Sequence, residues 1–126
     1  MVPSELRYTK DHEWVRVDGD VATVGITDYA ASQLGDIVFV ELPDAGRSLD
    51  QFAAFGVVES VKAVSDLFAP LSGTVAESNA GLTSSPELVN SEPYEGGWMI
   101  RLTLTAPAEV DDLLDATAYD ALIAAG

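Results

Sequence analysis

The chain has 126 residues, 48% of them hydrophobic, a length that supports one hydrophobic core but not two ordinary domains. Its 21 acidic and 6 basic side chains give a formal net charge of −15, which repels nucleic-acid phosphates, so nucleic acid is not an expected partner. The absence of cysteine excludes disulfides, thiolate nucleophiles and cysteine-ligated metal sites.

No apolar run in the sequence reaches the length of about 18 residues that a membrane-spanning helix needs. Residues 1–10 also lack the pattern of a leader or transit segment. We therefore expect a cytoplasmic protein without a membrane partner, and a monomer is the default expectation. The acidic surface either serves solubility or steers partner proteins that present basic docking surfaces.

The first part of the chain alternates polar and apolar residues, which is the pattern of half-buried strands. It predicts three strands, with a turn at Asp18-Gly19-Asp20 between the last two, over residues 5–9, 14–17 and 21–26. His12 is the only histidine, so no multi-histidine metal site can form. We expect it at the surface or at a strand end.

The strand pattern breaks at Thr27. Residues 27–34 predict a short helix that Thr27 or Asp28 caps, and Gly35 suits its C-terminal end. Residues 36–42 then form a nearly continuous apolar run, which predicts a strand buried on both faces.

Residues 56–73 predict a displayed hairpin around Lys62, one of only two lysines in the chain. Pairing Ser60 with Ala63 places Val61 and Lys62 at the tip. The tip has no glycine or asparagine, so a type I turn or a slightly longer loop is predicted in place of a primed turn. With either turn, the Lys62 ammonium points into water.

The remainder of the chain ends in helical periodicity. Residues 79–97 predict a long ordered loop with one helical turn after Pro86, and residues 98–104 predict a final strand. Residues 107–125 predict a C-terminal helical segment, either one helix or two that break near Asp115. We expect its apolar stripe to face the core, and the stripe comprises Val110, Leu113, Leu114, Thr117, Ala118, Ala121, Leu122 and Ala125.

Together these elements predict a mainly β fold, sandwich-like or barrel-like, with a short internal helix and a C-terminal helix. The sequence contains no phosphate-binding loop, metalloprotease motif, nucleophile elbow or calcium loop. We therefore expect no catalytic residues and no metal ligands in the chain itself. Its chemistry would come from an attached group.

The stretch Glu59-Ser60-Val61-Lys62-Ala63, with its continuation to Gly73, closely resembles the lipoylation motif of the glycine cleavage system H protein family. The resemblance covers nearly the whole chain. It also includes residues 8–14, 24–28, 34–40, 42–43, 85–94 and 96–98.

The resemblance implies a barrel-sandwich hybrid fold, like that of lipoyl domains, made of two small β-sheets. It also implies lipoate as cofactor, joined through an amide to Lys62. The matching motif positions around this lysine are Glu59, Ser60, Val61, Ala63 and Asp66. In that family the attached ring supplies both sulfur atoms, which agrees with the absence of cysteine here.

What the resemblance implies is a non-catalytic carrier that forms a single domain over residues 1–126. The family's lipoyl arm accepts an aminomethyl group from a pyridoxal-phosphate glycine decarboxylase (P protein). It carries this group to a tetrahydrofolate-dependent aminomethyltransferase (T protein), and dihydrolipoyl dehydrogenase (L protein) reoxidises the arm. Lipoate-attaching enzymes are further expected partners.

The matching positions around the family's arm-binding groove predict a cleft near Glu13, Tyr29 and Asp66, where carboxylates could pair with the carried ammonium. The opposite interpretation makes these residues ordinary surface acids and a half-buried tyrosine. Tyr29 departs from the family pattern, because many members have histidine there, so a proton-handling role of that histidine is not carried over. Residues 49–55 also lack the Gly-Asp or Gly-Glu turn often found before the motif.

Other interpretations remain open. A biotin carboxyl carrier displays a similar lysine, but its motif has methionine on both sides, whereas Val61 and Ala63 flank Lys62. A lipoyl domain of a 2-oxoacid dehydrogenase would be shorter and carry aspartate before its lysine. The chain could also serve as a lipoyl or octanoyl donor, or as a degenerate interaction module that keeps the fold without glycine cleavage.

Overall fold

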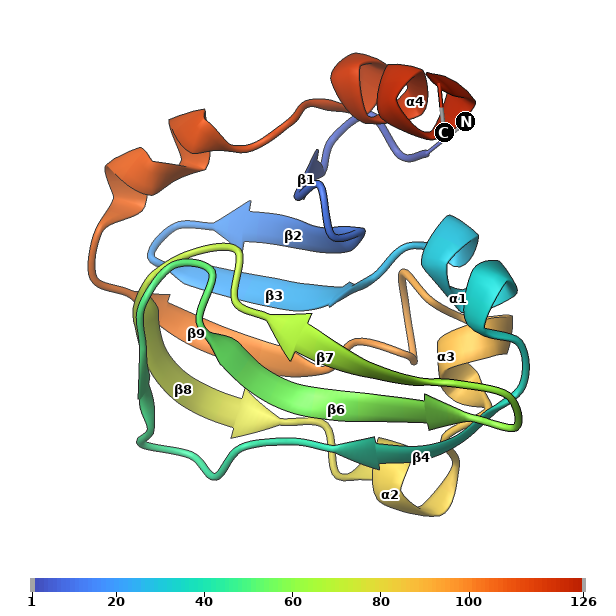
Figure 1. Cartoon of the computed structure of the whole chain (residues 1–126). Coiled ribbons are helices and arrows are strands. Elements are labelled where there is room, and N and C mark those ends of the chain that lie inside the picture. Colours follow the sequence, from blue (N-terminus) through green and yellow to red (C-terminus); the bar gives the residue numbers. More distant parts are fainter. Residues whose placement is uncertain (1, 126) are drawn as a thin grey trace.

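The computed structural model describes residues 2–125, which form two antiparallel β-sheets and several short helices (Figure 1). The larger sheet has six strands in the spatial order β1 (Arg7–Tyr8), β2 (Glu13–Asp18), β3 (Val21–Ile26), β9 (Ile100–Leu104), β8 (Gly73–Ser78) and β5 (Ser48–Leu49). The smaller sheet has three strands in the order β4 (Ile37–Glu41), β6 (Ala54–Ser60) and β7 (Val64–Phe68). The prediction of a mainly β fold is therefore confirmed. The predicted domain includes Met1 and Gly126, which lie outside the described residues.

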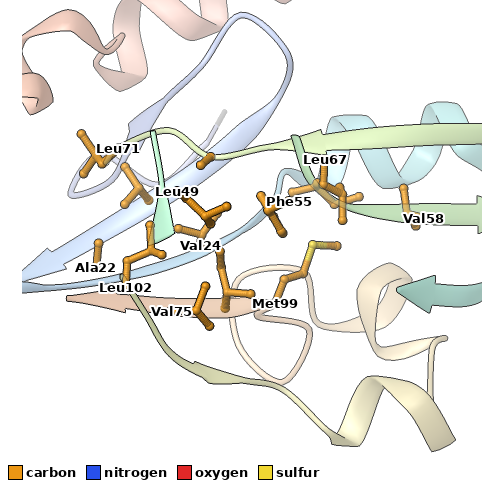
Figure 2. Close-up of a cluster of buried hydrophobic side chains, with 14 of the residues drawn as sticks. Ala22, Val24, Leu49, Phe55, Val58, Leu67, Leu71, Val75, Met99 and Leu102 are labelled. Atoms are coloured by element: carbon orange, nitrogen blue, oxygen red, sulfur yellow. The ribbon is translucent and has the colours of Figure 1, made fainter. Parts of the chain in front are cut away.

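Apolar side chains from both sheets meet in one buried core (Figure 2). Val24 and Leu102 come from the six-stranded sheet, Val58 and Leu67 come from the three-stranded sheet, and each is at most 1% exposed. Removing such side chains from water contributes about 25 cal/mol per Å² of apolar surface, the main favourable contribution to folding. The core therefore fixes how the two sheets face each other.

A second, smaller cluster lies on the other face of β2. Trp14 and Val15 are neighbours in this strand, so their side chains point to opposite faces, and Val15 joins the main core while Trp14 joins the second cluster. Tyr8 and Tyr119 stack there with ring centroids 4.7 Å apart. The second cluster therefore attaches the end of the chain to the edge of the larger sheet.

The helices are α1 (Asp28–Leu34), α2 (Gly81–Ser84), α3 (Leu88–Ser91), the 3₁₀-helix η1 (Pro107–Asp112) and α4 (Ala116–Ala125). The α1 prediction is confirmed, with Thr27 as its cap and Gly35 after its last residue. The helical turn expected after Pro86 is α3, whereas α2 was not predicted. The C-terminal segment follows the two-helix alternative, because η1 and α4 are separated by residues 113–115.

The predicted apolar stripe of the C-terminal segment is wrong for α4. Leu122 is 38% exposed and Ala121 is also exposed, whereas Tyr119, outside the predicted stripe, is fully buried. Ala116 and Ile123 flank Tyr119 in the second cluster. The large aromatic ring decides which face is buried, because stacking on Tyr8 covers more apolar surface than alanines could.

The prediction that residues 36–42 are buried on both faces is also wrong. In β4, Val38 is 53% exposed and Phe39 is 47% exposed. The strand lies at the edge of the smaller sheet, and its register with β6 shifts between Ile37 and Phe39, which turns consecutive side chains to the same side. An apolar run alone does not show whether a strand is central or at an edge.

Within residues 2–125, no helix is long and apolar enough to cross a membrane. The same part of the chain holds no group of three or more histidine, cysteine, aspartate or glutamate side chains placed to bind a metal ion.

Candidate functional site

Lys62 lies at the tip of the β6–β7 hairpin, which projects from the end of the molecule where α1 lies (Figure 1). The Ser60 backbone N–H donates to the Ala63 carbonyl over 2.8 Å, as the sequence predicts, and Glu59 pairs with Val64. Among the described non-glycine residues, positive φ angles occur at His12 and Phe52, so the tip is not a primed turn. The strand pairing and the turn type therefore both agree with the predicted hairpin.

The Ser60 side chain organises this tip. Its Oγ accepts hydrogen bonds from the backbone N–H groups of Lys62, at 3.3 Å, and Ala63, at 3.0 Å. A serine hydroxyl that bonds the backbone two and three residues ahead stabilises a tight turn without glycine. The Val61 N–H donates to the Asp36 carbonyl at 3.1 Å, which ties the tip to the segment between α1 and β4. Lys62 is therefore displayed on a defined loop.

The Lys62 side chain is exposed, and its stem runs beside the end of α1. Gly35, which follows α1, has φ of +85°, a conformation that favours glycine. A Cβ at Gly35 would lie 3.4 Å from Lys62 Cε. The Lys62 side chain therefore lies beside the C-terminal end of α1.

A cleft of about 310 Å³ opens between the β1–β2 turn, α1 and β7. The structure brings all three predicted cleft residues, Glu13, Tyr29 and Asp66, to its lining. The motif residues Glu59, Ser60, Val61 and Ala63 stay at the hairpin and do not line it. Its lining comprises Asp11, His12, Glu13, Ile26, Tyr29, Ala30, Gln33, Leu34, Val58, Ser65, Asp66 and Leu67.

Glu13 is a buried acid, only 1% exposed, so the surface-acid interpretation does not describe it. Its Oε1 accepts from Thr9 Oγ at 2.5 Å and its Oε2 accepts from the Phe68 N–H at 3.3 Å. Burial raises the pKa of Glu13 to about 7, although both hydrogen bonds favour the charged form. Glu13 can therefore gain or lose a proton near neutral pH. Asp66, in contrast, is an exposed acid at the rim.

His12 also lines the cleft, a role that the sequence analysis missed. It is partly buried and has φ of +73°, a conformation that histidine adopts more readily than most residues. Its Nδ1 lies 2.8 Å from the Tyr119 hydroxyl, and its ring centroid lies 5.1 Å from that of Tyr29. The hydrogen bond to Tyr119 joins residues far apart in the chain, and no local pattern indicates such a contact.

The lining of the cleft combines acids with apolar walls. Asp11, Glu13 and Asp66 supply carboxyl groups, and no lysine or arginine belongs to the lining. The apolar part comes from Ile26, Val58, Leu67 and their neighbours. Such a surface suits a flexible apolar chain with a positively charged end, because the walls cover the chain and the carboxylates pair with the cation.

Nearly all of the sequence matches a known family. A family model described as Glycine cleavage H-protein matches residues 6–125. The chain belongs to the glycine cleavage H-protein family. The glycine cleavage system H protein of Symbiobacterium thermophilum is 59% identical over 125 residues, which cover 99% of this chain and 98% of the relative. The one from Phenylobacterium zucineum is 57% identical over 119 residues, 94% of this chain and 98% of the relative.

A solved structure of the same family has the same fold. The crystal structure of a glycine cleavage system H protein from Mycobacterium marinum matches with a TM-score of 0.88 and 40% identity, and it covers 95% of this chain and 97% of that chain. The predicted barrel-sandwich hybrid with a lipoyl-domain-like fold is therefore confirmed. The hairpin that carries Lys62 belongs to the three-stranded half of this hybrid.

Proposed function

We propose that this chain is the lipoyl-bearing shuttle of a glycine cleavage system, with lipoate joined through an amide to Lys62. The single observation that carries the proposal is the exposed Lys62 at an ordered hairpin tip in a chain of this family. When bound, the lipoyl group supplies the disulfide that takes up an aminomethyl group at the P protein, delivers it at the T protein and is reoxidised at the L protein. An exposed tip allows the attaching enzyme to reach the Lys62 nitrogen and allows each later partner to reach the arm joined to it.

The residues of the cleft fit such an arm. Lys62 passes Gly35 at the end of α1, and Leu34 of that helix lines the cleft. The apolar walls would cover the carbon chain of the arm, and Glu13 and Asp66 would hold the ammonium of the carried group. A cleft that excludes water would slow the hydrolysis of this group between partners.

The proposal describes a carrier and not an enzyme. In it, the chain acts as a single lipoyl-carrier domain, the hairpin over residues 56–73 presents the lysine, and the C-terminal segment over residues 107–125 contacts the cleft residue His12 through Tyr119. The chain works as a monomer in the cytoplasm with the P, T and L proteins and a lipoate-attaching enzyme. The net charge of −15 supports docking on basic partner surfaces.

The attachment site is tested by intact mass and peptide mapping after expression with lipoate. We expect a lipoyl-sized increment on Lys62 that is absent from the variant Lys62→Ala and absent from Lys10, the second lysine. A biotinyl-sized increment would point to the biotin carrier. An unmodified Lys62 in the presence of a competent ligase would contradict the proposal and favour the degenerate module.

The shuttle role is tested by assays with the three partner enzymes. Glycine-dependent loading of the arm and its discharge on tetrahydrofolate are the expected results. A lipoylated chain that supports neither step but donates its acyl group to another lipoyl domain would instead be a lipoyl or octanoyl donor.

The cleft is tested with Glu13→Gln, which removes the charge but keeps the shape of the side chain. We expect faster release of formaldehyde and ammonia from the loaded arm. The matched control is Glu41→Gln, an exposed acid of β4 outside the cleft, which should leave the rate unchanged. Equal rates in the wild-type chain and Glu13→Gln would refute the role of Glu13.

A further inference from the structure

Tyr119 joins the C-terminal helix α4 to both walls of the cleft. Its side chain is fully buried, and its hydroxyl lies 2.8 Å from His12 Nδ1 and 2.8 Å from Thr27 Oγ. His12 lines the wall formed by the β1–β2 turn. Thr27 caps α1, which contributes Tyr29 and Leu34 to the opposite wall. One hydroxyl group therefore connects three elements that are distant in the sequence.

The donor and the acceptor can be assigned in each hydrogen bond of the Tyr119 hydroxyl. Thr27 Oγ is fully buried and already accepts from the Ala30 N–H at 3.2 Å. Among the hydrogen bonds of residues 2–125, Thr27 Oγ has one further partner, the Tyr119 hydroxyl. The Thr27 proton therefore goes to Tyr119, since a buried hydroxyl proton without an acceptor is unfavourable. Tyr119 then donates its own proton to His12 Nδ1.

This direction determines the state of the His12 ring. A Nδ1 atom that accepts a hydrogen bond carries no proton, so the neutral ring carries its proton on Nε2. Burial lowers the pKa of His12, while the Asp11 carboxylate raises it by a smaller amount. The titratable groups around the ring are Asp11 and Glu13 on its own turn, Tyr29 on α1 and Tyr119 on α4. At neutral pH this lining residue therefore has a hydrogen-bond donor at Nε2 and no positive charge.

We propose that Tyr119 is a positioning residue of the arm cleft, which fixes His12 as an uncharged donor and holds the His12 wall against α1. The inference rests on the proposed function, because the occupant it concerns is the primary ammonium carried on the Lys62 arm. A positively charged or displaced imidazole would weaken the attraction between this ammonium and the acids of the cleft. The C-terminal helix does not line the cleft, but through Tyr119 it positions residues that do.

The first test reads His12 directly in the unmodified chain. Since the chain has a single histidine, its ring ¹⁵N signals need no assignment among several. We expect an unprotonated Nδ1 and a protonated Nε2 at pH 7 in the wild-type chain, and loss of this preference in Tyr119→Phe. The matched control is Tyr8→Phe, which keeps the stacked ring pair and removes only the hydroxyl that donates to the Pro3 carbonyl. Circular dichroism checks that each variant is folded.

The second test measures hydrolysis of the loaded arm. We expect about fivefold faster hydrolysis in Tyr119→Phe, the effect of losing one hydrogen bond of typical net strength, and an unchanged rate in Tyr8→Phe. His12→Asn, which tolerates the positive φ of this position, should also hydrolyse faster. The double variant should be no faster than His12→Asn, because Tyr119 acts through His12.

A protonated Nδ1 in the wild-type chain would overturn the inference. An unchanged hydrolysis rate in Tyr119→Phe would also overturn it, as would an equal rise in Tyr8→Phe, since the effect would then be general loosening of the stack. Absence of a lipoyl group from Lys62 would refute the proposed function. The ¹⁵N measurement on the unmodified chain still decides separately whether Tyr119 fixes His12.

Discussion

Glu13 makes the stability of the chain depend on pH in a direction opposite to that of most carboxylates. Its pKa is 4.5 in an unfolded chain and about 7 in the folded chain, because the folded chain buries the charge. The folded state therefore holds the Glu13 proton more tightly than the unfolded state does. The stability contributed by the protonated group is fully present below pH 4.5 and is lost as the pH rises through 7. The maximum loss is about 3 kcal/mol, from 1.36 kcal/mol per pKa unit.

The assay is urea unfolding followed by tryptophan fluorescence, in the wild-type chain and in Glu13→Gln. Comparing the two chains cancels the contributions of the other acids, which titrate in both. Between pH 5 and pH 8, we expect the wild-type chain to lose about 2–3 kcal/mol relative to Glu13→Gln. Glu13→Gln also lowers the unfolding free energy by an amount that does not depend on pH. Thr9 and Phe68 donate to different oxygens of Glu13, and the glutamine amide has only one oxygen. A pH-independent difference between the two unfolding free energies would refute the raised pKa.

Three further results are expected. Protection of the loaded arm should improve as the pH rises through about 7, because ionised Glu13 attracts the ammonium, and hydrolysis assays should show a weaker dependence in Glu13→Gln. Thr27→Ala should lower the unfolding free energy by about 1–3 kcal/mol, through loss of the α1 cap and of the Tyr119 partner, and Thr27→Ser should recover most of it. Gly56→Ala should cost about 1–3 kcal/mol in urea unfolding, because the new Cβ would clash with the Glu41 carbonyl oxygen, and a change below about 0.5 kcal/mol would contradict this contact.

The sequence predicts the elements whose determinants are local. The α1 helix depends on Thr27 and Gly35 at its ends, and the hairpin depends on alternating residues around a polar tip. The α1 helix is confirmed with its predicted boundaries to within one residue, and the hairpin forms around the predicted tip, although its second strand ends at Phe68 and not at Gly73. The predictions fail where burial depends on distant partners. The exposure of Phe39 follows from the edge position of β4, and the burial of Tyr119 follows from its stack on Tyr8.

The residues of the candidate site also fall into those that local sequence predicts and those that depend on the fold. Lys62 and its flanking residues form one continuous motif, so sequence alone suffices to name them. Glu13, Tyr29 and Asp66 come from three separate elements, and only the resemblance to a family suggested that they meet. His12 lies at a strand end, directly before β2, as the sequence predicts, but its place in the cleft depends on a bond to Tyr119 that spans 107 positions of the chain. The burial of Glu13 likewise depends on the packing of the folded chain and has no local sequence signal.

Two features of the cleft lower the stability of the fold. Glu13 is a buried acid whose ionisation is unfavourable, and His12 is a non-glycine residue held at a positive φ angle. An apolar residue at position 13 would pack beside Leu67 without the cost of burying a carboxylate, and glycine at position 12 would relieve the backbone. Neither feature is required to join the two sheets, whose core is apolar. Both lie in the lining of one cleft beside the stem of Lys62, and the proposed arm gives each of them a use that the fold alone does not.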